Sequence, residues 1–165
     1  MEHKPKYRIE QTTTDWLLEI SGWAALAFIW IITLFYFRKL PDTIPTHFTI
    51  SGKADDFGSR WTIFLSPAIG TVLFTGMTIL NKYPHIFNYP VKITPENMLR
   101  HYTMATRLVR VLKLSVVIIF IIIAWTSCIA AIDQTNKLVF WFMPMILVIV
   151  FVPLGYYIYK SFNNK

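Results

Sequence analysis

Apolar residues come in long uninterrupted blocks along this chain, not at the short intervals that mark one face of a soluble helix or strand. Four blocks are long enough to cross the hydrocarbon core of a bilayer, which takes about 20 residues at ~1.5 Å of helix rise each. They cover residues 16–37, 62–80, 114–132 and 138–159. The pattern predicts an all-α integral membrane protein with four transmembrane helices, folded as a single membrane domain over residues 1–165.

The first block is expected to stay in the protein as a span and not to be cleaved as a signal peptide. Its apolar run covers residues 16–37, whereas the core of a signal peptide is about 7–15 residues long. The run begins late, at Trp16, and the charged pair Arg38–Lys39 follows it directly.

Composition agrees with a membrane location and removes several functions. Charged residues make up 15% of the chain, against about 25% in an average soluble domain. The net charge of +7 is attributed to membrane topology and anionic lipid headgroups, so no nucleic-acid partner is predicted. The single cysteine, Cys128, lies inside the third block, which excludes an internal disulfide and a cysteine-based zinc site. We expect it to be a small buried apolar side chain.

The distribution of lysine and arginine predicts the topology, since cytoplasmic flanks carry an excess of both. The N-terminal segment, residues 81–113 and the C-terminal tail together hold eleven of these residues, and the other two loops hold five. Both termini and loop 81–113 are therefore placed in the cytoplasm, and loop 38–61 outside it. The expected location is the cytoplasmic (inner) membrane.

The cytoplasmic loop is predicted to contain an amphipathic helix. Its first part, YPHIFNYP, is kept extended by two prolines, and the following TPEN suits a helix start. One apolar face is then expected from Met98, Tyr102, Ala105, Val109 and Leu112. We expect this helix to lie on the inner membrane surface and to run into the third span. It would anchor the loop to lipid or dock a cytoplasmic regulator, for which the candidate contacts are His85, Asn88, Tyr89, Arg100 and Arg107.

The outer loop is predicted to form a small structured cap. Pro41 and Pro45 keep its start extended, Ser51–Gly52 favours a tight turn, and HFTISGKADDF can form a short hairpin. An extracytoplasmic peptide or protein is the expected ligand. The candidate binding residues are His47, Phe48, Asp55, Asp56, Arg60 and Trp61. As a structural alternative, His47 would form hydrogen bonds within the loop while Asp55 or Asp56 pairs with Arg60 or Lys53.

Catalytic and transport chemistry have little support in the sequence. His47 with Asp55 and Asp56 gives only an H-x7-D-D spacing, with no second extracytoplasmic histidine. No catalytic residue, metal ligand or cofactor is therefore assigned. None of the four blocks carries an ionisable residue near its middle, which argues against a transporter. Asp15 and Glu19 are interpreted as carboxylates that favour the N-terminal end of the first helix.

The outer loop LPDTIPTHFTISGKADDFGSR resembles the signature of a domain of unknown function found at the N-terminus of SdpI-type bacterial membrane proteins. The signature has the form L-P-x-x-I-P-x-H-[FW]-N-x-x-G-x-x-D-x-[FWY]-x-[SK]. The matching residues are Leu40, Pro41, Ile44, Pro45, His47, Phe48, Gly52, Asp55 and Phe57. Thr49 departs from it, because asparagine is common there. The run NYPVKITPEN is also similar to small relatives of this domain, so that the resemblance covers roughly residues 25–115.

The resemblance implies immunity against a secreted toxin peptide, together with signal transduction through a membrane-tethered repressor. The loop around His47 would then face the toxin, and loop 81–113 would face the repressor. We therefore expect a non-enzymatic membrane protein that binds a peptide or protein. The alternatives are an accessory subunit of a larger inner-membrane complex and, third, a membrane-embedded metal-dependent enzyme.

Overall fold

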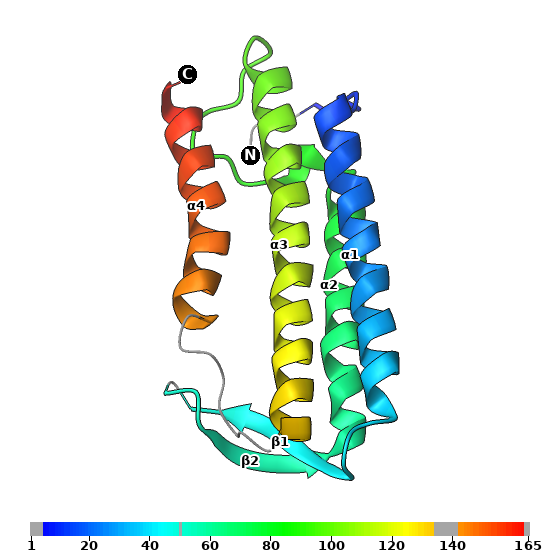
Figure 1. Ribbon diagram of the computed structural model, residues 1–165. Coiled ribbons are helices and arrows are strands. Elements are labelled where there is room, and N and C mark those ends of the chain that lie inside the picture. Colours follow the sequence, from blue (N-terminus) through cyan, green and yellow to red (C-terminus); the bar gives the residue numbers. More distant parts are fainter. Residues whose placement is uncertain (1–4, 50, 134–141, 164–165) are drawn as a thin grey trace.

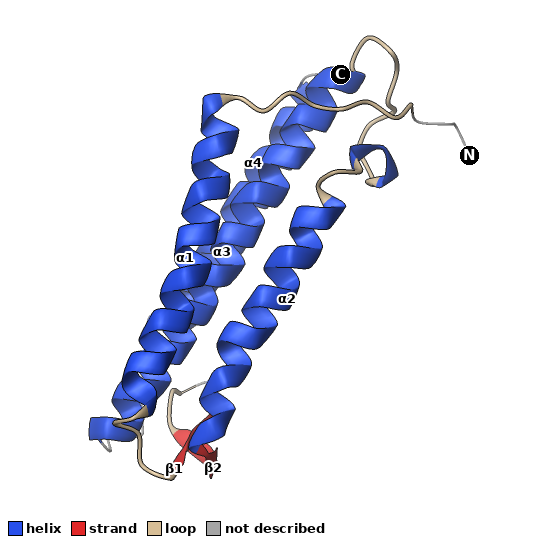
Figure 2. Ribbon diagram, turned by 90° about the vertical axis from the view of Figure 1, so that its right-hand side faces the viewer, coloured by secondary structure: helices blue, strands red, loops and turns tan. Residues whose placement is uncertain are grey.

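The fold is an upright bundle of helices with a β-hairpin across one end (Figures 1 and 2). The computed structural model describes residues 5–49, 51–133 and 142–163. Over these residues the helices are α1 (Thr13–Phe37), α2 (Leu65–Leu80), α3 (Met98–Asp133) and α4 (Phe142–Asn163). The strands are β1 (Thr43–Phe48) and β2 (Ala54–Ser59), and short 3₁₀ helices cover Arg60–Phe64 (η1) and Pro84–Ile86 (η2).

Four helices of the described chain are long and apolar enough to cross a membrane. They cover Thr13–Phe37, Arg60–Leu80, Met98–Asp133 and Pro144–Asn163, so the four-span architecture of a multi-pass membrane protein is confirmed. α1 and α2 lie on one flank of α3, and α4 lies on the other (Figure 1). The hairpin caps one end of the bundle, while the start of α1, the loop after α2 and the end of α4 lie at the opposite end, called here the terminal end.

α1 starts one turn earlier than its apolar block because Thr12 and Asp15 form a reciprocal cap. The Thr12 hydroxyl accepts a hydrogen bond from the Asp15 backbone N–H at 3.4 Å, and the Asp15 carboxylate accepts one from the Thr12 N–H at 3.0 Å. Two backbone donors that the helix leaves free are satisfied in this way. The cap therefore buries Asp15 at the terminal end of the bundle.

α3 corrects the prediction of an amphipathic helix lying on the membrane surface. Residues 98–113 are the first turns of a continuous 36-residue helix that stands within the bundle. Tyr102 and Ala105 are buried as the apolar face predicts, but Arg110 and Lys113 are buried as well. The prediction failed because the basic face of these turns meets acidic side chains of α1, so the bundle covers it.

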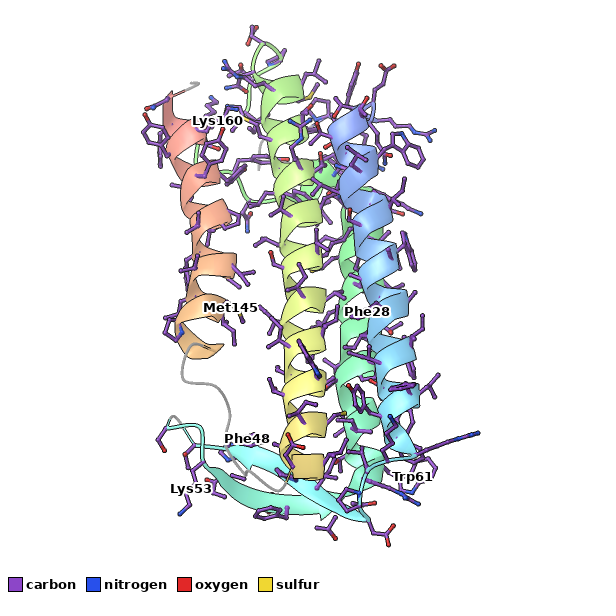
Figure 3. The ribbon with its side chains drawn as sticks, viewed as in Figure 1. Phe28, Phe48, Lys53, Trp61, Met145 and Lys160 are labelled. Atoms are coloured by element: carbon purple, nitrogen blue, oxygen red, sulfur yellow. The ribbon has the colours of Figure 1, made fainter. Side chains whose placement is uncertain are left out.

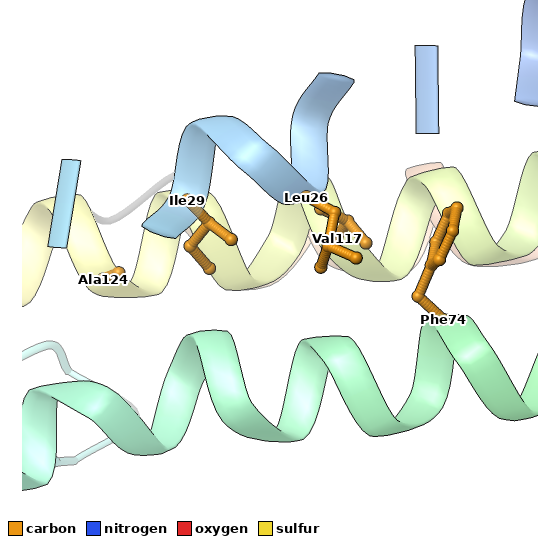
Figure 4. Close-up of a cluster of buried hydrophobic side chains, with 5 residues drawn as sticks. All are labelled: Leu26, Ile29, Phe74, Val117 and Ala124. Carbon is orange, nitrogen blue, oxygen red and sulfur yellow. The ribbon is translucent and has the colours of Figure 1, made fainter. Parts of the chain in front are cut away.

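One buried cluster holds the three central helices together. It contains Leu26 and Ile29 of α1, Phe74 of α2, and Val117 and Ala124 of α3 (Figure 4). Gly22 permits this close approach. A β-carbon at Gly22 would lie only 2.6 Å from the Phe74 ring. Small residues of this kind let helices approach when lipid supplies no hydrophobic driving force.

A second cluster fixes the hairpin to the bundle. Leu40, Ile44 and Ile63 pack on Cys128 and Ala131, which belong to the last turns of α3. β1 and β2 are antiparallel, with irregularities on either side of His47, and Gly52 takes a φ of 79° in the turn that joins them. Glycine adopts this left-handed conformation without steric cost. The hairpin is thus a supported element with one buried side, and Cys128 is buried as expected.

Candidate functional site

A network of five charged side chains joins α1 to α3 at the terminal end of the bundle. The side chains are Asp15, Glu19, Arg107, Arg110 and Lys113, called here the charged cluster. Arg107 Nε donates to Asp15 Oδ1 at 2.9 Å, and Arg110 Nε donates to Glu19 Oε1 at 3.0 Å. Lys113 Nζ donates to Glu19 Oε2 at 2.5 Å.

Lys113 lies deepest in the charged cluster and reaches all three central helices. Its side chain has no exposed area, and besides Glu19 it donates to the Thr78 hydroxyl at 2.9 Å. Its ammonium group also lies 4.5 Å from the centre of the Phe74 ring, within the range of a cation–π interaction. An ammonium group buried in a membrane domain is expensive unless it is paired. Glu19 is therefore the partner that permits Lys113 at this depth.

The charged cluster revises two sequence interpretations. Glu19 pairs with Arg110 and Lys113 of α3, so its role goes beyond favouring the end of α1. Arg107 was a candidate docking residue for a cytoplasmic regulator, but its guanidinium is held by Asp15 and by the Thr12 hydroxyl. Three cations face two carboxylates, which leaves the charged cluster with one surplus positive charge.

A cavity of about 810 Å³ adjoins the charged cluster between α1, α2 and the segment before α1. Glu19 and Arg110 line it from the charged cluster, and Thr78 lines it from α2. Its mouth carries the exposed cations Lys6, Arg8 and Lys82. The sequence prediction did not find this cavity, because the N-terminal stretch that lines it is far in sequence from its lining residues in α2 and α3.

The remaining docking candidates of loop 81–113 do not form one surface. The Tyr89 ring stacks on Tyr102 with centroids 5.5 Å apart, and its hydroxyl donates to the Pro84 carbonyl at 2.8 Å. Burial raises the pKa of Tyr89. His85 lines the cavity instead, whereas Asn88 and Arg100 are exposed. The predicted docking set is thus divided between the interior, the cavity and the surface.

At the other end of the bundle, His47 forms a hydrogen bond within the hairpin as the structural alternative predicted, but Arg60 has a different acidic partner from the predicted one. His47 Nδ1 lies 2.6 Å from Asp55 Oδ1, and both side chains are well exposed. Arg60 lies 3.6 Å from Asp42 instead of pairing with Asp55 or Asp56. The strand register explains the difference, because it brings His47 beside the two aspartates and leaves Arg60 at the base of the hairpin.

Asp56 and the aromatic residues complete this outer face. The Asp56 carboxylate accepts hydrogen bonds from the Thr46 hydroxyl at 3.3 Å and from the Phe57 backbone N–H at 2.9 Å. The Trp61 ring packs 4.7 Å from Phe37 and remains 63% exposed. Phe48 is half-buried on β1. Figure 3 shows Phe48 and Trp61 on opposite sides of the hairpin end, both far from Lys160 at the terminal end.

Metal chemistry gains no geometric support from the part of the chain that the structure describes. Within those residues, no group of three or more histidine, cysteine, aspartate or glutamate side chains is placed to hold a metal ion. His47 lies at the hairpin end, while η2, which contains His85, lies at the terminal end of the bundle. The two histidines therefore cannot bind the same metal ion.

Comparison with known proteins identifies one region of the chain. Residues 24–71 match the family model described as Domain of unknown function (DUF1648). The chain contains a DUF1648 domain. This domain begins in α1, includes the whole hairpin and ends in α2. It therefore contains the outer face around His47, but neither Glu19 nor the α3 part of the charged cluster.

One curated relative is similar over part of its length. It is an "Uncharacterized protein" of Archaeoglobus fulgidus, 35% identical over 74 residues. The match covers 40% of this chain and 40% of the relative, so the chain spans less than half the length of the relative it matches. No solved structure matches the chain.

Proposed function

We propose that this protein is a non-enzymatic membrane receptor for a peptide or protein, which it binds through the DUF1648 hairpin. The supporting observation is the two-sided construction of the hairpin. Ile44 of β1 is buried against Cys128 and Ala131 of α3, while His47, Asp55 and Phe57 of the same hairpin are exposed. Exposed residues on a loop held by a rigid scaffold are a common arrangement for recognition.

The chemistry of the exposed side suits a protein or peptide ligand. Phe57 is 50% exposed and Trp61 is 63% exposed, and aromatic side chains are enriched at the centres of protein interfaces. His47 and Asp55 add a polar pair that can donate or accept hydrogen bonds. Both strands are edges of a two-stranded sheet, so an extended peptide can add as a further strand.

The resemblance to SdpI-type proteins gives this proposal a biological direction. In that direction the hairpin faces outward, the ligand is a secreted toxin peptide, and a cytoplasmic regulator is the second partner. The positive-inside distribution favours the same orientation, with the terminal end in the cytoplasm. The protein would then act in the cytoplasmic membrane in immunity or signal transduction.

Site-specific photo-crosslinking in native membranes tests the proposal. A photoreactive amino acid at Trp61 samples the hairpin, and the same residue at Tyr159 is the control, since Tyr159 has a similar exposure of 67% at the terminal end. We expect a peptide or protein adduct at Trp61 that is absent at Tyr159 and that weakens in His47→Ala and Asp55→Asn. These two variants should still fold, because an exposed ion pair contributes only about 0–1 kcal/mol.

Three other results would replace the proposal. Lipid adducts alone at Trp61 would show that the hairpin rests in the membrane interface without a protein ligand. Stoichiometric integral membrane proteins attached at both positions would favour the alternative of an accessory subunit in a larger membrane complex. Zinc bound by the purified protein and lost in His47→Ala would favour the metal-dependent enzyme.

A further inference from the structure

The cavity beside the charged cluster opens where α1 and α2 diverge. Figure 2 shows these two helices close together near the hairpin and further apart toward the terminal end. The space between them is lined by the first turns of α1, the last turn of α2 and residues 6–11 before α1. The cavity is thus at the level where the outermost turns of two spans meet the membrane surface.

Positive charge dominates the lining of this cavity. Lys6, Arg8, Lys82 and Arg110 contribute four cations, and Glu19 is the one acidic residue among the described lining residues. Glu19 is already shared by Arg110 and Lys113. No carboxylate among the described lining residues is left to balance the cations at the mouth of the cavity. The cavity is therefore complementary to an anion.

Two buried polar groups show that the inner end of the cavity is built for a polar ligand. Arg110 is 5% exposed, and its Nε–H to Glu19 is the one hydrogen bond that it makes within the described chain. Its Nη1 lies 3.7 Å from Asp15, beyond hydrogen-bonding distance. Asn81 is 9% exposed, and its side-chain oxygen has no hydrogen-bond partner among the described residues. A buried acceptor without a partner is costly, and a ligand hydroxyl can supply the missing donor.

The α1 wall of the cavity is apolar and aromatic. Trp16, Ile20 and Trp23 line it, and each is more than half exposed on the outer surface of the helix. Tryptophan is enriched at the boundary between headgroups and acyl chains. This wall can contact the acyl chain of a ligand that extends from the cavity into the membrane. A free inorganic anion has no such chain and would leave the wall uncovered.

From this arrangement we propose that the cavity is a binding site for the headgroup of an anionic phospholipid. The phosphate lies among Arg8, Lys82 and Arg110, headgroup hydroxyls reach Asn81, and an acyl chain passes over Ile20. The site lies at the opposite end of the bundle from the proposed peptide site and does not depend on it. Its ligand comes from the membrane leaflet at the terminal end.

The test measures lipid binding by two matched double variants with the same change in charge. Arg8→Gln/Lys82→Gln removes two exposed cations from the mouth of the cavity, and Lys39→Gln/Lys53→Gln removes two exposed cations at the hairpin end. Each protein is placed in nanodiscs of phosphatidylcholine with increasing phosphatidylglycerol, and bound phosphatidylglycerol is counted by native mass spectrometry after release. Both variants leave the charged cluster intact, so both are expected to fold like the wild-type protein.

We expect the wild-type protein and the hairpin-end variant to retain phosphatidylglycerol in preference to phosphatidylcholine. The cavity variant should need roughly 20–30-fold more phosphatidylglycerol for the same occupancy, because each basic side chain near an anionic leaflet is worth about fivefold in affinity. Equal retention by the two variants would overturn the proposal. Displacement of the retained lipid by millimolar inorganic phosphate or glycerol phosphate would also overturn it, since the site would then bind a soluble phosphate.

Discussion

We predict that the two most closely paired members of the charged cluster differ in how much stability is lost when each is replaced. Glu19 has two cationic partners, Arg110 and Lys113, whereas Glu19 is the one carboxylate that Lys113 contacts among the described residues. Glu19→Gln keeps the shape of the side chain and removes its charge. Lys113→Met keeps most of the apolar stem but removes the ammonium group, and with it the cation–π contact with the Phe74 ring.

The expected losses in unfolding free energy follow from what each variant leaves behind. Glu19→Gln removes the carboxylate beside the fully buried ammonium of Lys113 and leaves it with neutral partners such as the Thr78 hydroxyl; a buried charge that loses its ionic partner costs about 3–5 kcal/mol. Lys113→Met leaves Glu19 paired with Arg110 at 3.0 Å. Its cost is therefore about 1–2 kcal/mol, a lost hydrogen bond to a charged group that is partly offset by burial of an apolar side chain.

The double variant separates pairing from general damage. Replacing a buried ion pair as a whole often costs little. Glu19→Gln/Lys113→Met removes the ammonium that Glu19→Gln leaves without a carboxylate, so that only Arg110 has lost Glu19, and the double variant should be more stable than Glu19→Gln alone. We expect a coupling free energy of at least about 2 kcal/mol from the double-mutant cycle. Unfolding in mixed detergent micelles, followed by tryptophan fluorescence, measures all three variants. Lys53→Met, on the exposed hairpin, is the control and should change the unfolding free energy by less than about 0.5 kcal/mol.

Two outcomes would refute this reasoning. If the two single variants cost the same and their effects add within about 0.5 kcal/mol, then the ion pair does not stabilise the bundle. If Lys113→Met costs more than Glu19→Gln, then Lys113 owes its buried position to the Phe74 ring and Thr78 and not to the carboxylate.

Two further predictions test helix packing and orientation. Gly22→Ala should lower the unfolding free energy by about 1–3 kcal/mol, because the added methyl group meets the aromatic ring on α2. Gly76→Ala is the matched control, since nothing lies within 4 Å of its new methyl group, and it should be neutral or slightly stabilising; equal losses at both glycines would contradict the packing argument. For orientation, a membrane-impermeant maleimide should label Lys53→Cys in intact cells and Lys82→Cys only after lysis, in a cysteine-free background. The opposite pattern would reverse the topology drawn from the lysine and arginine distribution.

The spans were predictable because membrane crossing depends on local composition. Three of the four apolar blocks fall within helices of the structure; the fourth, residues 138–159, overlaps α4 from Phe142 onward, and its first residues lie outside the described chain. α1 begins at Thr13 because a polar cap extends it beyond its apolar block. α3 begins at Met98, well before its apolar block. Its first turns are polar, and they are covered by α1 and not by lipid. Apolar blocks show which residues can contact lipid. They do not show where polar side chains of one helix contact another helix.

The charged cluster could not be derived from the sequence with certainty, although a signal was present. Asp15 and Glu19 lie four residues apart on one helix face, and Arg107 and Arg110 lie three apart at the corresponding depth of another span. The predicted topology already placed both sets at the same side of the membrane. The missing information was that the first and third spans are neighbours, which depends on contacts distant in sequence, such as the packing of Leu26 and Ile29 with Val117.

The hairpin shows the same division between local and distant information. Its turn and its extended ends follow from Pro41, Pro45 and Gly52. The pairing of its charges does not, because an irregular register beside His47 decides which aspartate it meets. A one-residue change of register would turn these side chains to the other face of the sheet.

The unbroken length of α3 has a mechanical consequence. Its 36 residues contain neither proline nor glycine, and at ~1.5 Å per residue the helix is about 54 Å long, well beyond the ~30 Å hydrocarbon core. The hairpin is packed on its last turns through Cys128 and Ala131, and Arg107 lies in its early turns. Sharp kinks in helices occur at proline, at glycine or serine pairs, or at bulges. Since α3 has neither proline nor glycine, we expect it to move as one rigid helix. A push or twist applied to the hairpin from one compartment would therefore arrive at the salt bridges on the opposite side as a rigid displacement.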